Sequence, residues 1–306
     1  MIRTTACLAA VVLIALDAQR SPPPIRGLSD ATTLASTYDA ILDADFSAAE
    51  ARMQPVCTPT PVFCQLLQAV GMWWQIALDP TDVGRDAQFT QLAEQAIAAA
   101  EAWTMREPQR AEAWFARGAA YAARAQWRVL RRERLAASRD GKRIKDALER
   151  ALELDPALHD AKFGLGMYHY YADVGPAALR FLRWMLLLPG GDRALGLREM
   201  LDARDHGSVV RGEADYQLHL IYLWYERRFD EALALVNALQ QRYPHNPLFY
   251  LIEADIHDTY FHDARSSEAT LRALIARAET QQLNASALAL RRAQHALQAL
   301  TTRARR

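Results

Sequence analysis

The sequence predicts an all-α fold built from repeated helical units, and three observations support this prediction. The chain has 306 residues, of which 51% are hydrophobic, and its Ala- and Leu-rich stretches repeat apolar residues at helical spacing. Long alternating runs of Val, Ile and Thr between turn residues, which indicate strands, are nearly absent. Similar segments that end in proline recur along the chain, which is typical of a repeat architecture.

The first residues have the pattern of a secretory signal peptide. A short basic start at Met1–Arg3 precedes an unbroken apolar run over residues 6–16, which is too short to span a bilayer comfortably. We therefore expect a signal peptide at 1–18 and a stiff Pro-rich linker at 19–30, with uncleaved anchoring as the alternative. No later apolar stretch is long enough to span, so we expect a periplasmic or secreted mature chain without a transmembrane segment.

Removal of the signal peptide would leave two cysteines, Cys57 and Cys64. In an oxidising compartment, an even pair at this short separation indicates a local disulfide across the intervening turn. The alternative is two free, partly buried thiols. Their spacing does not fit a CxxC redox motif.

The clearest repeat unit lies at residues 111–156. Its first half places two aromatic residues and a small residue at helical spacing, and its second half places apolar residues before a closing proline: Trp114, Gly118, Tyr121, Ile144, Leu148, Ala151 and Pro156. The small residue allows two helices to approach closely. This pattern resembles the tetratricopeptide repeat, with its W-x2-L-G-x2-Y first helix and its second helix closed by proline.

The resemblance extends over residues 62–262. Further matching positions are Leu67, Gly71, Trp74, Ala96, Ala100, Trp103 and Pro108; Gly166, His169, Ala177, Phe181, Trp184 and Pro189; Tyr222, Ala232, Val236, Leu239 and Pro244; and Tyr250, Ala254 and His257. The resemblance implies an α-solenoid of antiparallel helix pairs over 31–304, a tetratricopeptide-like superhelix with capping helices at 31–52 and 282–304. An additional helix is expected after Pro189, with Asp192 as its N-cap and Gly207 at its end.

The resemblance also implies a concave groove lined by the first helix of each pair. Residues carried over to groove positions are Met72, Ile76, Phe115, Ala122, Phe163, Met167, Tyr170, Tyr171, Tyr216, Leu220 and Trp224. Such an aromatic and methionine-rich surface suits an extended peptide or a helix of a protein partner. The alternative is that these side chains are buried against neighbouring helices.

A basic run occupies residues 124–145. We expect Arg128, Arg131 and Arg132 to share a helix face, which could contact anionic lipid, glycan or an acidic partner. The alternative is a solvated face paired with downstream acids such as Asp146 and Glu149. Lys+Arg and Asp+Glu both number 36, so no global field favours nucleic acid, which we do not expect as a partner.

Metal-binding and catalytic motifs are weak in this sequence. Two histidines, His257 and His262, are five residues apart and miss a common helix face, while Asp258 and His262 supply only two ligands. Neither Gly164-x-Gly166 nor Pro189-Gly190-Gly191 fits a nucleotide loop. We therefore expect no metal, no cofactor and no catalytic activity, although acids from different repeats could still meet in space.

These observations favour an exported, non-catalytic scaffold that binds a protein segment in its concave groove. A second hypothesis is an all-α envelope enzyme that acts on glycans. A third is a membrane-peripheral assembly factor that uses the basic face at 124–145.

Overall fold

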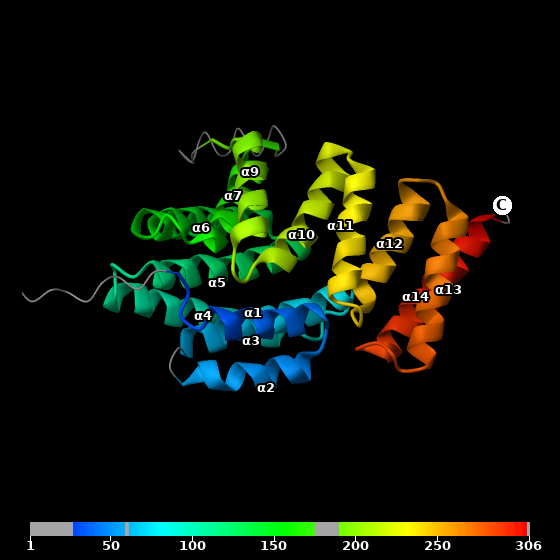
Figure 1. The fold of residues 1–306 in the computed structure, drawn as a ribbon, viewed down its shortest axis with the longest axis horizontal. Helices are drawn as coiled ribbons and strands as arrows, with labels where there is room; N and C mark the ends of the chain where they lie inside the picture. The colour runs from blue at the N-terminus through cyan, green and yellow to red at the C-terminus, as the bar shows by residue number, and fades with distance from the viewer. Residues whose placement is uncertain (1–26, 59–60, 175–189, 305–306) are drawn as a thin grey trace, which may run out of the picture.

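The computed structural model describes residues 27–58, 61–174 and 190–304, and these residues form helices and connecting turns without a β-strand (Figure 1). The predicted all-α class is confirmed for this part of the chain. The expected signal peptide, most of the expected linker and the expected helix between Ala177 and Pro189 lie outside the described residues. The helices are α1 (Ala31–Leu42), α2 (Phe46–Cys57), α3 (Pro61–Leu78), α4 (Asp86–Arg106), α5 (Ala111–Leu130), α6 (Arg134–Leu154), α7 (His159–Val174), α9 (Arg193–His206), α10 (Arg211–Ile221), the π-helical turn η1 (Tyr222–Glu226), α11 (Phe229–Arg242), α12 (Pro247–Thr259), α13 (Ala264–Glu279) and α14 (Ser286–Ala304).

Successive helices pack against one another along the chain, and the pair α5 and α6 shows why. A Cβ added to Gly118 on α5 would lie 2.5 Å from Cδ2 of Leu148 on α6, so the glycine permits the close approach. The long stretch between the two halves of this repeat unit lengthens both helices. As a result α5 continues to Leu130, and α6 begins at Arg134.

The additional helix expected after Pro189 is present as α9. The Asp192 side chain caps it by accepting a hydrogen bond of 2.8 Å from the backbone N–H of Leu195. The helix ends at His206, and Gly207 donates its backbone N–H to Ala203. At the crossing of α9 with α7, a Cβ added to Gly196 would lie 2.5 Å from the carbonyl oxygen of Gly166, so the two backbones are nearly in contact.

Helix α1 does not cap an end of the molecule, contrary to the expectation for residues 31–52. It contacts α3 and α10 and lies beside α3 in Figure 1. Tyr243 donates its hydroxyl to Asp39 over 2.7 Å, and the Asn246 side chain donates to the carbonyl of Leu42 over 2.6 Å. Because its residues Leu34, Ile41 and Leu42 are almost completely buried, α1 forms part of the core.

The aromatic core joins helices that are far apart in sequence. The Trp74 ring on α3 lies 4.9 Å from the Tyr216 ring on α10 and 6.3 Å from the Phe249 ring on α12, measured between centroids. Both contacts have edge-to-face geometry, which is favourable for aromatic pairs. These rings therefore fix the second half of the chain against the first.

Buried His219 on α10 makes stability depend on pH. The side chain is completely buried, and neither ring nitrogen has a hydrogen-bonding partner among the described residues. Burial lowers the pKa of His219 to about 4, because a buried imidazolium loses its hydration. The unfolded chain, with an ordinary pKa of about 6.5, then binds more protons than the folded chain between these values. This histidine should therefore lower the free energy of unfolding by about 2 kcal/mol between pH 7 and pH 5.

The measurement is urea unfolding of the wild type and of His219→Leu at pH 7 and pH 5. Leucine does not titrate, so the variant should lose this part of the pH dependence and gain relative stability at pH 5. An unchanged difference between the two pH values in His219→Leu would show that other groups carry the acid sensitivity.

Candidate functional site

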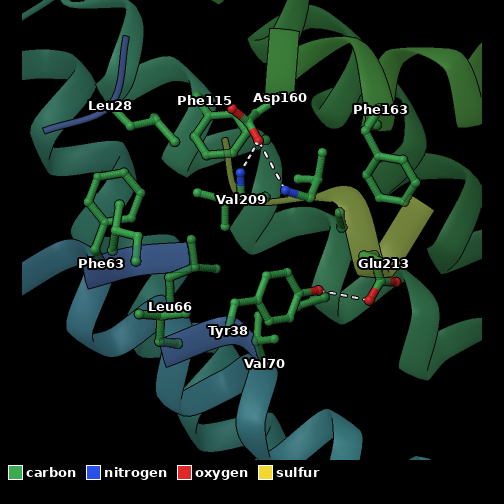
Figure 2. Close-up of a pocket in the computed structure, with 18 of the residues that line it drawn as sticks. Leu28, Tyr38, Phe63, Leu66, Val70, Phe115, Asp160, Phe163, Val209 and Glu213 are labelled. Atoms are coloured by element: carbon green, nitrogen blue, oxygen red, sulfur yellow. Dashed lines mark hydrogen bonds between the residues drawn. The ribbon is translucent and has the colours of Figure 1, made fainter. Parts of the chain in front are cut away.

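A mostly apolar cavity of about 100 Å³ lies where the N-terminal residues meet α3, α5 and α7. Figure 2 shows the side chains of Leu28, Phe63, Phe115 and Phe163 around it. An apolar cavity of this order can stay dry or hold a small apolar molecule. The cavity is formed partly by the chain's own N-terminal segment, since Leu28, Leu34 and Tyr38 also line it.

One carboxyl group, that of Glu213 on α10, lies at the edge of this cavity. Glu213 is buried and accepts hydrogen bonds from the Tyr38 hydroxyl (2.7 Å) and from the side-chain amides of Gln126 (3.3 Å) and Gln217 (3.0 Å). Burial raises the pKa of the Glu213 carboxyl and that of Tyr38. The group therefore joins α1, α5 and α10 in one buried network.

A second carboxylate, that of Asp160 on α7, orders the turn between α9 and α10. It accepts hydrogen bonds from the backbone N–H groups of Ser208 (2.9 Å), Val209 (2.8 Å) and Val210 (3.0 Å). These bonds satisfy donors that would otherwise be left unpaired near the start of α10. Figure 2 shows the bonds to Asp160 at the edge of the cavity.

The residues that precede α1 are held by acidic side chains. Glu112 on α5 accepts hydrogen bonds from the backbone N–H of Ser29 (2.6 Å) and from its hydroxyl (2.9 Å). The backbone N–H of Gly27 donates to Asp155 over 2.7 Å. Leu28 and Tyr38 line the cavity together with Phe115 and Ala122, two positions on α5 that the tetratricopeptide resemblance assigned to an open groove.

The predicted groove residues on α7, α10 and η1 do not form one surface. Phe163 lines the cavity and is buried, and Tyr170 is buried completely. Tyr216 packs on Trp74 in the aromatic core. Met167, Tyr171 and Leu220 are partly buried, and Trp224 is exposed.

Two of these residues, Tyr170 and Tyr171, meet Tyr225 where α7 approaches η1. The rings of Tyr170, Tyr171 and Tyr225 form an edge-to-face trio, with centroids 5.5 to 5.9 Å apart. Tyr225 is 43% exposed, and its neighbour Trp224 is 60% exposed. We call Tyr171, Trp224 and Tyr225 the aromatic rim.

Ionic and hydrogen bonds hold the aromatic rim in place. The Tyr170 hydroxyl donates to Glu226 over 2.5 Å, and Nε of Arg193 donates to the same carboxylate over 2.7 Å. The bond from Arg193 is the main cause that lowers the pKa of Glu226, while burial raises the pKa of Tyr170. Glu226 is therefore charged at neutral pH, and it ties η1 to α7 and α9.

The prediction that Arg128, Arg131 and Arg132 form one basic helix face is wrong. Helix α5 ends at Leu130 and Arg132 has a left-handed backbone with φ of 64°, so Arg128, Arg131 and Arg132 do not share a helix face. Nη1 of Arg128 lies 2.6 Å from Asp140, and Nε of Arg131 lies 2.7 Å from Asp86. The alternative of local pairing is confirmed further along, where Lys142 binds Asp146 and Lys145 binds Glu149, each over 2.5 Å.

The two cysteines lie at the junction of α2 and α3, where Cys57 and Cys64 are joined by a disulfide with their Cα atoms 4.8 Å apart. Cys57 ends α2, and Cys64 lies in the first turn of α3. The bridge therefore fixes the angle between these two helices.

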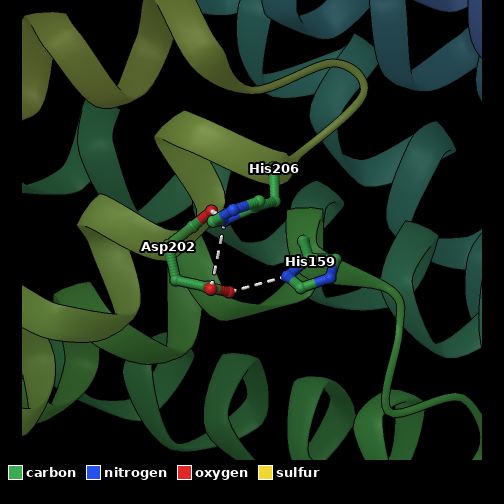
Figure 3. A group of neighbouring side chains, drawn as sticks. All are labelled: His159, Asp202 and His206. Atoms are coloured by element: carbon green, nitrogen blue, oxygen red, sulfur yellow. Dashed lines mark hydrogen bonds and ion pairs between the residues drawn. The ribbon is translucent and has the colours of Figure 1, made fainter.

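Two histidines, His159 and His206, meet at Asp202, a grouping that the sequence reasoning missed (Figure 3). His159 begins α7, and the other two residues are i,i+4 neighbours on α9. The i,i+4 spacing of Asp202 and His206 is visible in the sequence, but only the fold brings His159 close to this pair. By contrast, Asp258 lies on α12, which ends before His262, so these two do not share a helix face.

Neither a comparison with protein-family models nor one with curated proteins finds a match to the chain. Among the described residues, no helix combines the length and apolarity needed to cross a bilayer.

Proposed function

We propose that the chain is an exported, non-catalytic α-solenoid scaffold of the tetratricopeptide type that binds a protein segment at its aromatic rim. The repeat spacing around Gly118 and Leu148 and the packing of successive helices support the architecture. Two N-terminal features support export, namely the apolar run at residues 6–16 and the Cys57–Cys64 disulfide, since disulfides persist in oxidising compartments.

The observation that carries the binding proposal is the exposure of two large aromatic side chains side by side in sequence. Trp224 is 60% exposed and Tyr225 is 43% exposed, whereas the chain's other tryptophans that the structure describes are buried or partly buried. Tryptophan and tyrosine are the residue types that most often dominate binding energy at protein interfaces. An aromatic pair of this kind therefore suits an apolar side chain of a partner.

The backbone beneath the rim favours binding because it is fixed before a partner arrives. Trp224 and Tyr225 belong to the π-helical turn η1, and π-helical turns are frequent at functional sites. The turn closes with Arg227 in the left-handed region, where φ is 56°. Because Glu226 also anchors the turn, little conformational entropy is lost on binding.

The two alternative functions, an enzyme that acts on glycans and a membrane-peripheral assembly factor, have less support from the side chains. A glycan-cleaving enzyme requires acids that face an open groove, but Glu213 is enclosed by Tyr38 and two amides. A membrane-peripheral factor requires free cations, but Arg128 and Arg131 are paired with acids.

The proposal is tested by photo-crosslinking from the rim. A photoreactive phenylalanine derivative replaces Trp224, and the matched control carries it at Met105, which is 77% exposed at the end of α4. We expect a protein adduct from position 224 in the cell envelope that position 105 does not give.

Affinity for the captured protein is then measured with Trp224→Ala/Tyr225→Ala. Loss of a dominant interface contact should weaken binding by about 2 kcal/mol, or about 30-fold. The matched control is Val83→Ala/Met105→Ala, whose side chains are also exposed and whose binding should match the wild type. Equal crosslinking from both positions, or equal affinity of the two double variants, would refute the proposal.

A further inference from the structure

We propose that His159, Asp202 and His206 form a binding site for a divalent transition-metal ion of the zinc class, which bridges α7 and α9. The potential ligand atoms of the three side chains all lie within 4.8 Å of one another. Nδ1 of His159 lies 2.7 Å from Asp202, and Nδ1 of His206 lies 3.3 Å from the same carboxylate (Figure 3).

The arrangement needs only side-chain adjustments of about 1 Å to coordinate an ion. Zinc binds nitrogen and oxygen ligands at about 2.0–2.2 Å in a tetrahedron, which places ligand atoms about 3.5 Å apart. The His206–Asp202 pair, at 3.3 Å, is close to this separation. The His159–Asp202 pair, at 2.7 Å, must open by about 0.8 Å, and a pair as wide as 4.8 Å must close by about 1.3 Å. The His206 side chain is 61% exposed at the end of α9, so rotation of its ring can supply that movement.

The donor set selects the class of ion. Two imidazole nitrogens and one carboxylate suit zinc and its neighbours among the late first-row metals, whereas calcium and magnesium prefer oxygen ligands alone. Three protein ligands leave a further position for water.

A second observation concerns Lys162, one turn after His159 on α7. Its ammonium group lies 2.7 Å from Asp202 and 3.5 Å from Nδ1 of His159, so a positive charge already sits between two of the three ligands. An arriving metal ion must displace this ammonium group. Lys162 therefore competes with the metal, and its removal should strengthen metal binding.

The site would act on the same two helices that support the aromatic rim. Tyr171 lies on α7, and Arg193, which holds Glu226, begins α9. The inference nevertheless rests on the three ligands and not on the proposed scaffold function, so either can fail without the other.

The experiment is a titration of the untagged chain with zinc in competition with a chromophoric chelator. Cobalt serves as a second probe, because its visible absorption reports ligand number and geometry. We expect a single ion per chain, with affinity lowered by about tenfold or more in His159→Ala and in His206→Ala. Lys162→Met should bind several-fold more tightly than the wild type, which distinguishes this site from scattered surface histidines.

The matched control is His245→Ala, since His245 is also exposed and also paired with a carboxylate, that of Asp43, over 2.8 Å. It should bind zinc as the wild type does. Circular dichroism and urea unfolding of each variant without metal establish that loss of binding is not loss of folding. Failure of the wild type to compete, wild-type affinity in either histidine variant, or weaker binding by Lys162→Met would each overturn the proposal.

Discussion

We expect Asp140→Ala to lower the free energy of unfolding by about 3–5 kcal/mol, the range for removing one partner of a buried ion pair. Asp140 on α6 is completely buried and is surrounded by arginines. Its oxygens accept hydrogen bonds from Arg124 (2.7 and 3.0 Å), Arg128 (2.6 Å) and Arg143 (3.2 Å). Arg124 is itself only 7% exposed, so the variant would leave its charge buried beside a single remaining acid, Glu94.

Urea unfolding measures this effect, and Asp146→Ala is the matched control. Asp146 lies on the same helix and pairs with Lys142, but its side chain is 54% exposed, so its loss should change stability by less than about 1 kcal/mol. A double variant, Asp140→Leu/Arg124→Met, should recover much of the lost stability, because it removes both buried charges. Similar losses from the two single variants would contradict the assignment of Asp140 as a buried charge centre.

The second large effect is expected for Gly196→Ala at the crossing of α7 and α9. The added methyl group would lie 2.5 Å from the carbonyl oxygen of Gly166 and 2.6 Å from the backbone nitrogen of Tyr170. Backbone atoms cannot rotate aside as a side chain can, so the two helices must separate. We expect a loss of about 3 kcal/mol, at the upper end of the range for overpacked cores.

Gly71→Ala on α3 is the matched control for this variant. Its added methyl group would meet nothing closer than Cδ1 of Ile41 at 3.8 Å, an ordinary contact. Alanine favours helix over glycine, so Gly71→Ala should gain about 0.5 kcal/mol in urea unfolding. A loss from Gly196→Ala no greater than the change in Gly71→Ala would show that α7 and α9 do not cross as closely as described.

Much of the local structure could be predicted from sequence because it depends on neighbouring residues. The cap Asp192 acts within one turn of helix, and Gly118 acts on the helix that follows its own; both lie where their patterns placed them. The additional helix α9 is recognisable for the same reason, since its start and end signals adjoin it.

The position of α1 could not be predicted in this way. Two of its partners, Glu213 on α10 and Asn246 at the N-cap of α12, lie more than 170 residues away, and no local pattern specifies them. For the same reason, the sequence does not show whether the groove is open. The tetratricopeptide resemblance places Tyr216 and Tyr170 on the inner face, but only the path of the whole chain decides whether the inner face is open or filled.

The candidate sites also combine features that the local sequence shows with features that only the fold shows. The helix-face prediction for Arg131 requires the helix to continue through this residue. Helix α5 instead ends one residue before Arg131, whose side chain pairs with Asp86. Asp202 and His206 share a face that the sequence shows directly. The third member, His159, is 43 residues from Asp202, so the cluster is visible only in three dimensions.

The contacts of α1 determine when folding can finish. This helix leaves the ribosome among the first described residues, yet the carbonyl of Asp43 just beyond it accepts a hydrogen bond from Asn284, 241 residues later. A chain with such distant pairings is slow to close, because a very long loop must be ordered before the contact forms. Helices α2 and α3 can pack on α1 early, but Leu42, which meets Gly212 on α10, stays partly uncovered and prone to associate with other chains until α10 emerges. Helical repeats with neighbour-only contacts can fold stepwise, but here the contacts at the end of the first helix are complete only when Asn284 has emerged.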